Sequence, residues 1–373
     1  MAWPRIDWVQ IRDDLQYAVL RSRGAHHHLT VSRSVKLCVA GMLFLWAQVA
    51  LRFFWVFDAL FFCGWRRTEV RRPLFVIGNF RSGTTLLFRM LQGTGETTTS
   101  LTTWEIYLAP TVSQRLMWRG IGIVDRWVGS PLQRMVRGIN SILRKIPYHP
   151  IDVFEPEEDA GALMYTWTGF FTWFLFPRRD TVPASAMIDE LPPRRRRIAM
   201  KFYHDILKKH LYAVTRHRDH EAPVLISKNP AFTGAVEALR GQFPDARFVQ
   251  ISREWPATTE SSSSWFQVWF HLLGNVTTAT PNRSVVERLV TTWHRYPRRF
   301  PVDQVELSRL VATPKSVLRS LIRRQDLDWL RDRAQLDHAL GQLQRDHGSG
   351  GSGTRRPMFP RSTQHGSFRS SGA

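Results

Sequence analysis

Apolar residues are distributed along the chain in two contrasting patterns. Residues 35–65 form the longest apolar run, VKLCVAGMLFLWAQVALRFFWVFDALFFCGW, which Gln48, Arg52 and Asp58 interrupt. From residue 73 onward, apolar residues come in short runs that are separated by glycine turns and amphipathic stretches. The first pattern indicates an apolar helical segment, whereas the second indicates strands that alternate with helices.

Three of the short apolar runs predict buried parallel strands, because each is bounded by a turn and leads into a segment with helical periodicity. These strands are expected at residues 73–77, 224–226 and 247–251, with the following helices at residues 83–91, near 232–243 and near 256–266. The alternation predicts an α/β fold, a P-loop-like, doubly wound parallel sheet that is flanked by helices. The intervening stretch, residues 100–220, is expected to be mainly helical.

Composition divides the chain into three parts. Residues 1–72 are a basic N-terminal segment that carries the apolar run, and residues 73–346 are the expected α/β domain. Residues 347–373 are rich in Gly, Ser and Arg, which predicts a disordered tail because such a composition cannot support a packed core.

The apolar run has the features of a membrane-contacting segment. A spanning helix needs about 20 apolar residues, and a central arginine costs about 2.5–3.5 kcal/mol on insertion scales. Residues 35–65 therefore favour an interfacial helix or re-entrant hairpin, with a buried amphipathic helix pair as the alternative. We expect a membrane-associated protein and favour the cytoplasmic side, although basic residues at both ends of the run leave its orientation undetermined.

The charge balance is strongly basic and narrows the range of partners. The chain has 52 Lys and Arg against 31 Asp and Glu, a net charge of +21, which attracts anions such as nucleic acid, acidic lipid or a charged nucleotide. No zinc-finger spacing and no ribonucleoprotein aromatic motif occurs, so nucleic acid is not expected as a partner. Cys38 and Cys63 are the only cysteines, which excludes a disulfide framework and a cysteine-rich zinc site.

The sharpest motif is GNFRSGTT at residues 78–85, directly after a predicted strand and at the start of a predicted helix. The glycines allow a tight turn in which successive N–H groups converge on a phosphate, and the helix N-terminus adds its positive end. Arg81 adds a fixed charge. The lysine of a Walker A loop is replaced by Thr84, which disfavours an ordinary kinase or ATPase.

The stretch PLFVIGNFRSGTTLLFRML resembles the 5′-phosphosulfate-binding loop of sulfotransferases. It is similar to the bacterial-type branch, which has Arg-Ser-Gly-Thr-Thr where the cytosolic enzymes have Lys-Ser-Gly-Thr-Thr. A second stretch, PVLISKNPAFTGAVEALRGQFPDARFVQISREWPATTESSSSW, resembles the strand-lysine segment and the 3′-phosphate site of the same family. Two separated signatures in the right order, both at strand ends, are far more specific than either alone.

The resemblance implies that the chain binds 3′-phosphoadenosine 5′-phosphosulfate, the sulfuryl donor. The implied donor-binding residues are Arg81, Ser82, Gly83, Thr84 and Thr85 at the 5′-phosphosulfate, Lys228 on the second strand, and Arg253 with Ser261 at the 3′-phosphate. Asn229 replaces the family's usual serine after that lysine. No metal is expected, because the family reaction needs none.

Catalysis requires a base for the acceptor proton and charge stabilisation on the leaving phosphate. The resemblance places a glutamate base near Glu105, and Arg81 supplies the charge at the donor. His149 is a further candidate base, because imidazole titrates near neutral pH. The acidic run at residues 155–159 is expected to cap a helix or position the acceptor.

The predicted activity is transfer of a sulfuryl group to a hydroxyl or amine of a small-molecule, glycan or lipid acceptor. The match weakens beyond residue 305, where Val305–Pro314 retains little of the family's strand and turn. An inactive nucleotide-binding or scaffold protein of the same fold is therefore the alternative, and a different phosphate-handling P-loop enzyme is the third hypothesis. The sequence does not identify the acceptor.

Overall fold

A computed structural model describes residues 3–19, 29–93, 96–146, 150–176, 178, 180–216, 222–274, 283–331, 337 and 340–341. The strands are β1 (Leu74–Gly78), β2 (Thr98–Thr99), β3 (Val224–Lys228), β4 (Arg247–Ser252) and β5 (Asp303–Glu306). The α-helices are α1 (Trp8–Val19), α2 (Val31–Phe61), α3 (Thr84–Leu91), α4 (Thr103–Tyr107), α5 (Val112–Trp127), α6 (Pro131–Leu143), α7 (Thr172–Leu175), α8 (Pro193–Thr215), α9 (Val236–Gln242), α10 (Trp255–Trp269), α11 (Arg283–Arg295), α12 (Leu307–Ala312) and α13 (Pro314–Gln325). Short 3₁₀ turns lie at η1 (Cys63–Arg67), η2 (Asp159–Thr166), η3 (Ala184–Ala186), η4 (Ile188–Glu190), η5 (Pro230–Gly234), η7 (Tyr296–Arg299) and η8 (Asp328–Leu330), and η6 (Phe270–Gly274) is a π-helix.

The sheet is parallel throughout its described pairings. Over the described residues its strand order is β2-β3-β1-β4-β5, so β1 lies in the middle and pairs with β3 on one side and β4 on the other. All residues of β1 are buried, as expected for a central parallel strand. This arrangement confirms the predicted α/β fold with a parallel sheet.

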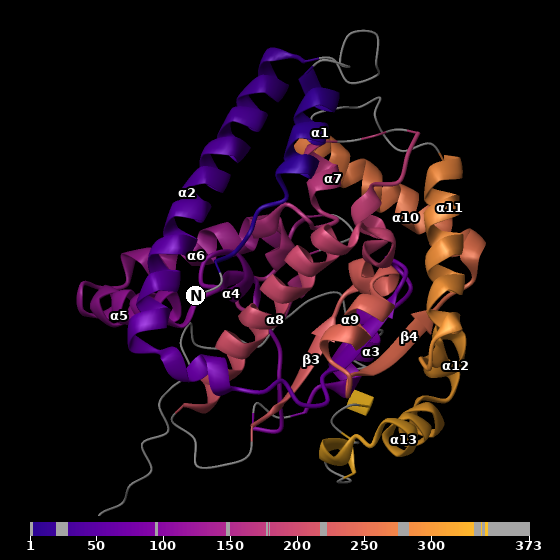
Figure 1. The fold of residues 1–373 in the computed structure, drawn as a ribbon. Helices are drawn as coiled ribbons and strands as arrows, with labels where there is room; N and C mark the ends of the chain where they lie inside the picture. Colours follow the sequence, from indigo (N-terminus) through magenta and orange to yellow (C-terminus); the bar gives the residue numbers. More distant parts are fainter. Residues whose placement is uncertain are drawn as a thin grey trace, which may run out of the picture.

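Alternate side chains of each strand enter two separate cores. Phe75 and Ile77 belong to the core under α8, α9, α10 and α11, whereas Leu74 and Val76 belong to the core under α3 and α13. Figure 1 shows these helices covering the two faces of the sheet. The pattern follows from the two-residue side-chain period of a strand.

The main differences from expectation lie outside the strands. The predicted helix near residues 232–243 is divided into η5 and α9. The apolar helical segment predicted at residues 35–65 is confirmed as α2, one continuous helix, and this excludes the hairpin and the helix pair that were the alternatives. The polar residues in the run do not break the helix. Arg52 donates a hydrogen bond to the carbonyl of Gln48 one turn earlier, and Asp58 is neutralised by a buried partner.

Asp58 joins α2 to the α/β domain. Its side chain is fully buried, pairs with the equally buried ammonium of Lys209 on α8, and accepts hydrogen bonds from the backbone N–H groups of Val112 and Ser113 at the start of α5. The ammonium of Lys209 also lies 4.0 Å from the ring centroid of Trp55. The carboxylate of Asp58 therefore holds three helices together. Burial lowers the pKa of Lys209 to about 8, although the carboxylate of Asp58 favours the charged form.

Replacing Asp58 with asparagine is expected to destabilise the protein by about 3–5 kcal/mol, because the charge of Lys209 would remain buried without a counter-ion. Chemical denaturation measures the change, and Asp13→Asn is the matched control, since Asp13 forms an exposed pair with Arg12. A loss below 1 kcal/mol for Asp58→Asn would show that the pair does not hold α2 in place.

Candidate functional site

The predicted donor-binding residues lie where three parallel strands end. Gly78 at the end of β1 lies opposite Ile251 of β4, and Val76 of β1 lies opposite Lys228 at the end of β3. β1 lies between β3 and β4, so the chain connections of the sheet lead away on opposite sides of β1. The carboxyl end of β1 is therefore a topological switch point. Ligands of open α/β sheets bind in the crevice at such a point.

The loop after β1 has the shape of an anion cradle. Gly78 has φ +145°, and a Cβ there would lie 2.3 Å from the carbonyl oxygen of Ile251, so only glycine fits. Gly83 has φ +97° and directly precedes the first turn of α3. Glycines at these positions allow the loop to turn tightly onto the N-terminus of α3, which favours an anion.

The structure brings the two predicted half-sites together at Arg81. Its guanidinium Nε donates a hydrogen bond to the hydroxyl of Ser261 on α10, 3.3 Å away, across 180 positions of sequence. The neighbouring Ser262 donates to the carbonyl of Phe80, with 3.1 Å between the oxygens, and so ties α10 to the phosphate loop. Arg253 follows β4 directly and is exposed at the same edge of the sheet.

Within the loop, the predicted anion-binding hydroxyls have different surroundings. Ser82 is buried and donates to the carbonyl of Asn79, which closes the turn, whereas Thr84 is buried and Thr85 is exposed on the first turn of α3. The loop is also held by Thr233 of η5, whose hydroxyl accepts from the N–H of Gly78 and donates to its carbonyl. Thr233 lies within the second stretch that resembles the family, but it was not predicted as a site residue, because its contact with Gly78 spans 155 positions of sequence.

Lys228 ends β3 beside the acidic segment. Its ammonium lies 3.1 Å from Oε1 of Glu157 and 3.7 Å from Oε1 of Glu158. Burial alone would lower the pKa of Lys228, but the two carboxylates raise it above its ordinary value. The lysine is therefore held charged at the edge of the sheet, next to two carboxylates that were expected only to cap a helix or to position the acceptor.

Asp159, the next carboxylate, lies beneath this edge of the sheet. It accepts hydrogen bonds from the hydroxyl of Ser227 (2.8 Å), the amide of Asn229 (2.9 Å) and the hydroxyl of Tyr203 (2.8 Å). Burial nevertheless raises the pKa of Asp159 to about 6. Asn229, the departure from the family pattern, thus supports the acidic segment directly behind Lys228.

Glu105 lies in α4, where its carboxylate serves the local structure. Oε2 accepts hydrogen bonds from the backbone and side chain of Thr102 in a capping box, and Oε1 lies 3.1 Å from the buried guanidinium of Arg115. Burial alone would raise the pKa of Glu105, but Arg115 and the contact with His210 hold it well below its usual range. Its predicted role as a base stays a prediction, and His149 lies outside the described residues.

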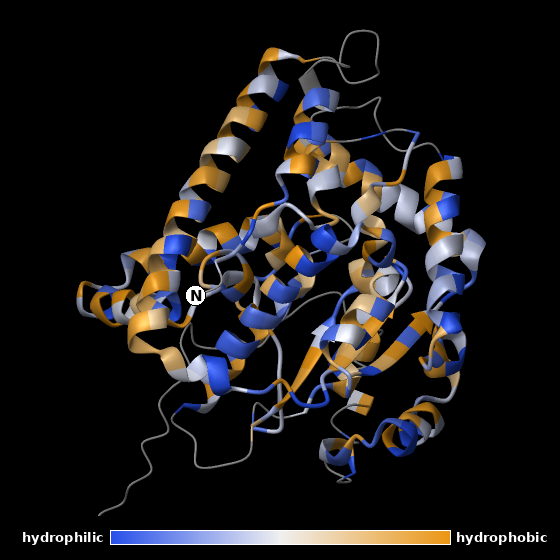
Figure 2. Cartoon of the chain, in the orientation of Figure 1, coloured by the Kyte–Doolittle hydropathy of each residue, from blue (hydrophilic) through white to orange (hydrophobic). Residues whose placement is uncertain are grey.

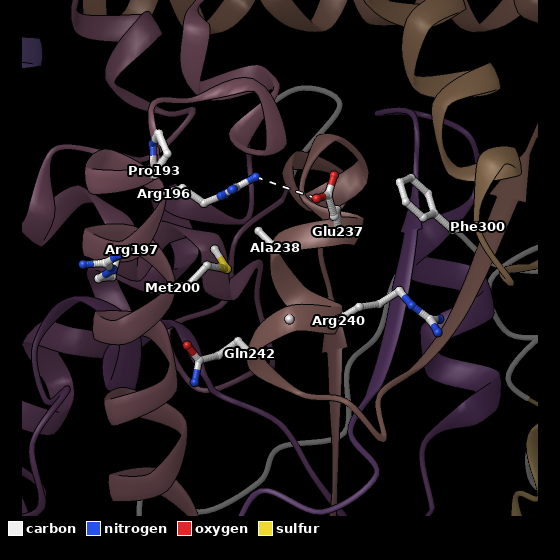
Figure 3. Close-up of a pocket in the computed structure, with 10 residues that line it drawn as sticks. Pro193, Arg196, Arg197, Met200, Glu237, Ala238, Arg240, Gln242 and Phe300 are labelled. Atoms are coloured by element: carbon white, nitrogen blue, oxygen red, sulfur yellow. Dashed lines mark ion pairs between the residues drawn. The ribbon is translucent and has the colours of Figure 1, made fainter.

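A cavity of about 550 Å³ between α8 and α9 is separate from these residues (Figure 3). Arg196, Arg197 and Arg240 contribute to its lining, and Arg196 lies 4.0 Å from Glu237. The lining includes no residue of the phosphate loop and none at the ends of β3 and β4. Over the part of the chain that the structure describes, no group of three or more His, Cys, Asp or Glu side chains is placed to hold a metal ion.

Comparison with known proteins identifies relatives of the whole domain. The family model "Sulfotransferase family" matches residues 73–331. Sulfotransferase STF9 from Mycobacterium avium has a similar structure, with a TM-score of 0.65 and 18% identity over 93% of this chain and 85% of that one. Sulfotransferase STF1 from Mycobacterium tuberculosis H37Rv gives a TM-score of 0.58 and 19% identity over 90% and 86%. No curated protein matches by sequence.

The raised pKa of Asp159 predicts a specific pH dependence of stability. The folded state holds this proton up to about pH 6 and the unfolded state releases it near pH 4, so stability should fall as the pH rises between these values, by about 3 kcal/mol. Denaturation of the parent and of Asp159→Asn at pH 4 and pH 7 isolates this contribution. Parallel pH profiles for the two proteins would contradict it.

Proposed function

The chain belongs to the sulfotransferase family, and we propose that it transfers a sulfuryl group from 3′-phosphoadenosine 5′-phosphosulfate to an acceptor hydroxyl or amine. The observation that supports this most strongly is the hydrogen bond between Arg81 and Ser261. The sequence places these residues in separate signatures, one for each end of the donor. Their contact is what a single nucleotide site at the ends of β1 and β4 requires.

The residues at this edge fit the donor chemically. Gly78 and Gly83 adopt positive φ angles that favour glycine, and the loop that they shape leads into the N-terminus of α3. We assign the 5′-phosphosulfate to this loop with Arg81, and the 3′-phosphate to Arg253 with Ser261. A guanidinium and a hydroxyl are suited to a doubly charged phosphate because both donate hydrogen bonds to its oxygens.

In this proposal the chain contributes binding, orientation and charge. The donor would supply an activated sulfuryl group and a bisphosphate leaving group. Arg81 would stabilise the charge that develops on the leaving phosphate, and Lys228, held charged by Glu157 and Glu158, would add a second cation at the same edge. The acceptor loses one proton as its oxygen or nitrogen bonds to sulfur, so a base must lie on the acceptor side.

Two carboxylates are candidates for this base. Glu105 has the sequence position that the family resemblance assigns to the base. Its low pKa means that it takes up a proton poorly, and its two oxygens already contact Thr102 and Arg115. Glu157 lies next to Lys228 at the strand edge, and this favours it as the second candidate. His149 stays a third candidate from the sequence.

We also propose that the protein works in contact with a membrane. Among the residues that the structure describes, one helix, α2, is long and apolar enough by length and composition to cross a bilayer, although core helices and signal sequences pass the same test. Only 11% of its apolar window is buried inside the protein. Membrane contact would favour a lipid or other hydrophobic molecule as the acceptor.

Arg253→Ala is expected to weaken the binding of adenosine 3′,5′-bisphosphate about 10- to 100-fold, because a hydrogen bond to a charged group contributes about 1.5–3 kcal/mol. Calorimetry measures the change, and Arg319→Ala on α13 is the matched control, since it removes an exposed arginine away from the strand ends. Equal binding by the parent and Arg253→Ala would show that Arg253 does not bind the nucleotide. No binding by a folded parent would overturn the proposed function.

Glutamine variants separate the two candidate bases. If Glu157 is the base, Glu157→Gln lowers kcat by about 10²- to 10⁴-fold while nucleotide binding persists. Glu105→Gln should then mainly lower stability, by about 3–5 kcal/mol, because Arg115 stays buried without its counter-ion. The reverse pattern, with kcat lost and stability kept in Glu105→Gln, would identify Glu105 as the base. Glu158→Gln serves as the control for a changed charge beside Lys228.

A further inference from the structure

The outer face of α2 carries a continuous apolar stripe. Its exposed side chains follow one another at spacings of three or four residues, which places them on a single side of the helix. They are Val35, Val39, Met42, Trp46, Val49, Phe53, Phe57 and Leu60. Figure 2 shows this helix as largely hydrophobic along its length.

A second apolar surface lies on α5 and α6, which the sequence did not associate with a membrane. On α5 the exposed apolar side chains again follow helical spacing, and Trp127 at its end is 84% exposed. On α6 the exposed apolar residues Met135, Ile139 and Ile142 share one face. Figure 1 shows α5 and α6 beside the C-terminal half of α2, on the side of the molecule away from α12 and α13.

The charges of the α5–α6 hairpin, residues 112–146, are almost all positive. The segment contains seven arginines and lysines, of which Arg115 is buried against Glu105, and one acidic residue, Asp125. Asp125 is buried and accepts hydrogen bonds from the N–H groups of Leu132 and Gln133 at the start of α6, so it adds little negative charge to the surface. Arg134 and Arg137 are exposed on α6. Apolar and basic groups on one helical surface match an anionic bilayer interface.

The inner face of α2 is attached to the protein along most of its length. Near the middle of the helix, Phe44 packs edge-on against Trp167, with ring centroids 4.8 Å apart. Further along, the amide of Gln48 donates to the carbonyl of Tyr165, and Trp55 and Asp58 are buried. A helix that crosses a bilayer needs apolar surroundings on all sides over about 30 Å. These attachments leave only one side of α2 for lipid.

We propose that the outer face of α2 and the α5–α6 hairpin together form a monotopic docking surface for an anionic lipid bilayer, with α2 lying in the plane of the interface. The surface unites elements that are more than fifty residues apart in the sequence and excludes the spanning orientation for α2. It would hold the protein against the membrane without removing any part of the α/β domain from water. The proposal is independent of the sulfotransferase activity, because none of these residues belongs to the nucleotide site.

Flotation of the full-length protein with vesicles tests the surface. The parent should bind vesicles of phosphatidylcholine with phosphatidylglycerol more tightly than vesicles of phosphatidylcholine alone. Arg134→Gln with Arg137→Gln should lower affinity for the anionic vesicles about 20-fold, since each basic residue near such a surface contributes about a factor of five. Equal binding to both kinds of vesicle would overturn the role of charge, and no binding by the parent would overturn the proposal.

A charge placed in the apolar surface tests the contribution of the hairpin. Trp127→Glu with Ile142→Glu should reduce vesicle binding at least about tenfold, whereas Val311→Glu, at an exposed apolar position on α12, should leave it unchanged. Circular dichroism and thermal denaturation confirm that each variant is folded. If the double variant binds vesicles like the parent, the hairpin is not part of the surface. If it instead dissociates a dimer formed without lipid, the surface serves a second copy of the chain.

The two cysteines distinguish the monotopic from the spanning orientation. Cys38 and Cys63 are both exposed; Cys38 lies in α2, and Cys63 begins η1 just beyond the C-terminal end of α2. The part of α2 from Cys38 to Phe61 rises about 35 Å along the helix axis. Single-cysteine proteins, Cys38→Ser and Cys63→Ser, are bound to sealed vesicles and treated with an impermeant thiol reagent. Permeabilising the vesicles with a pore-forming toxin should not increase the labelling of either protein. Increased labelling of one of them would show that α2 crosses the bilayer and would overturn the proposal.

Discussion

The parallel pairing of β1 with both β3 and β4 is the constraint on which the site depends. Parallel strands present their carboxyl ends at one edge, so loops that are distant in sequence must meet there. Residues 78–85 follow β1, Lys228 ends β3, and Arg253 follows β4. The contact between Arg81 and Ser261 across 180 positions is a direct consequence of this pairing.

Buried carboxylates organise the helical half of the molecule around this edge. Asp58 neutralises Lys209 and caps α5, and Glu105 pairs with Arg115 and caps α4. Both of these carboxylates have an opposite charge and backbone donors, which is the condition under which such groups are tolerated inside proteins. The same chemistry that fixes the helices therefore lowers the basicity of Glu105, the carboxylate that the family resemblance assigns to catalysis.

Local patterns predicted the sheet better than the helices around it. The runs that form β1, β3 and β4 are short, apolar and bounded by turns, so buried strands could be predicted from them. The glycine turn that surrounds Gly83 could also be predicted from its motif. The division into η5 and α9, the continuity of α2, and the attachment of Glu105 to Arg115 depend on partners that are distant in sequence. Lys209, the partner that keeps Asp58 inside a helix, lies 151 positions away, and no local pattern links the two.

The most direct test of the account compares two ligands of the unmodified protein. A site with a dedicated 3′-phosphate position at Arg253 and Ser261 should bind adenosine 3′,5′-bisphosphate at least about tenfold more tightly than adenosine 5′-phosphate, because only the former engages that position. Calorimetry at matched ionic strength gives both affinities. Equal affinities, or tighter binding of ATP than of the bisphosphate, would contradict the sulfuryl-donor site. The fold would then show only that the site binds phosphate groups.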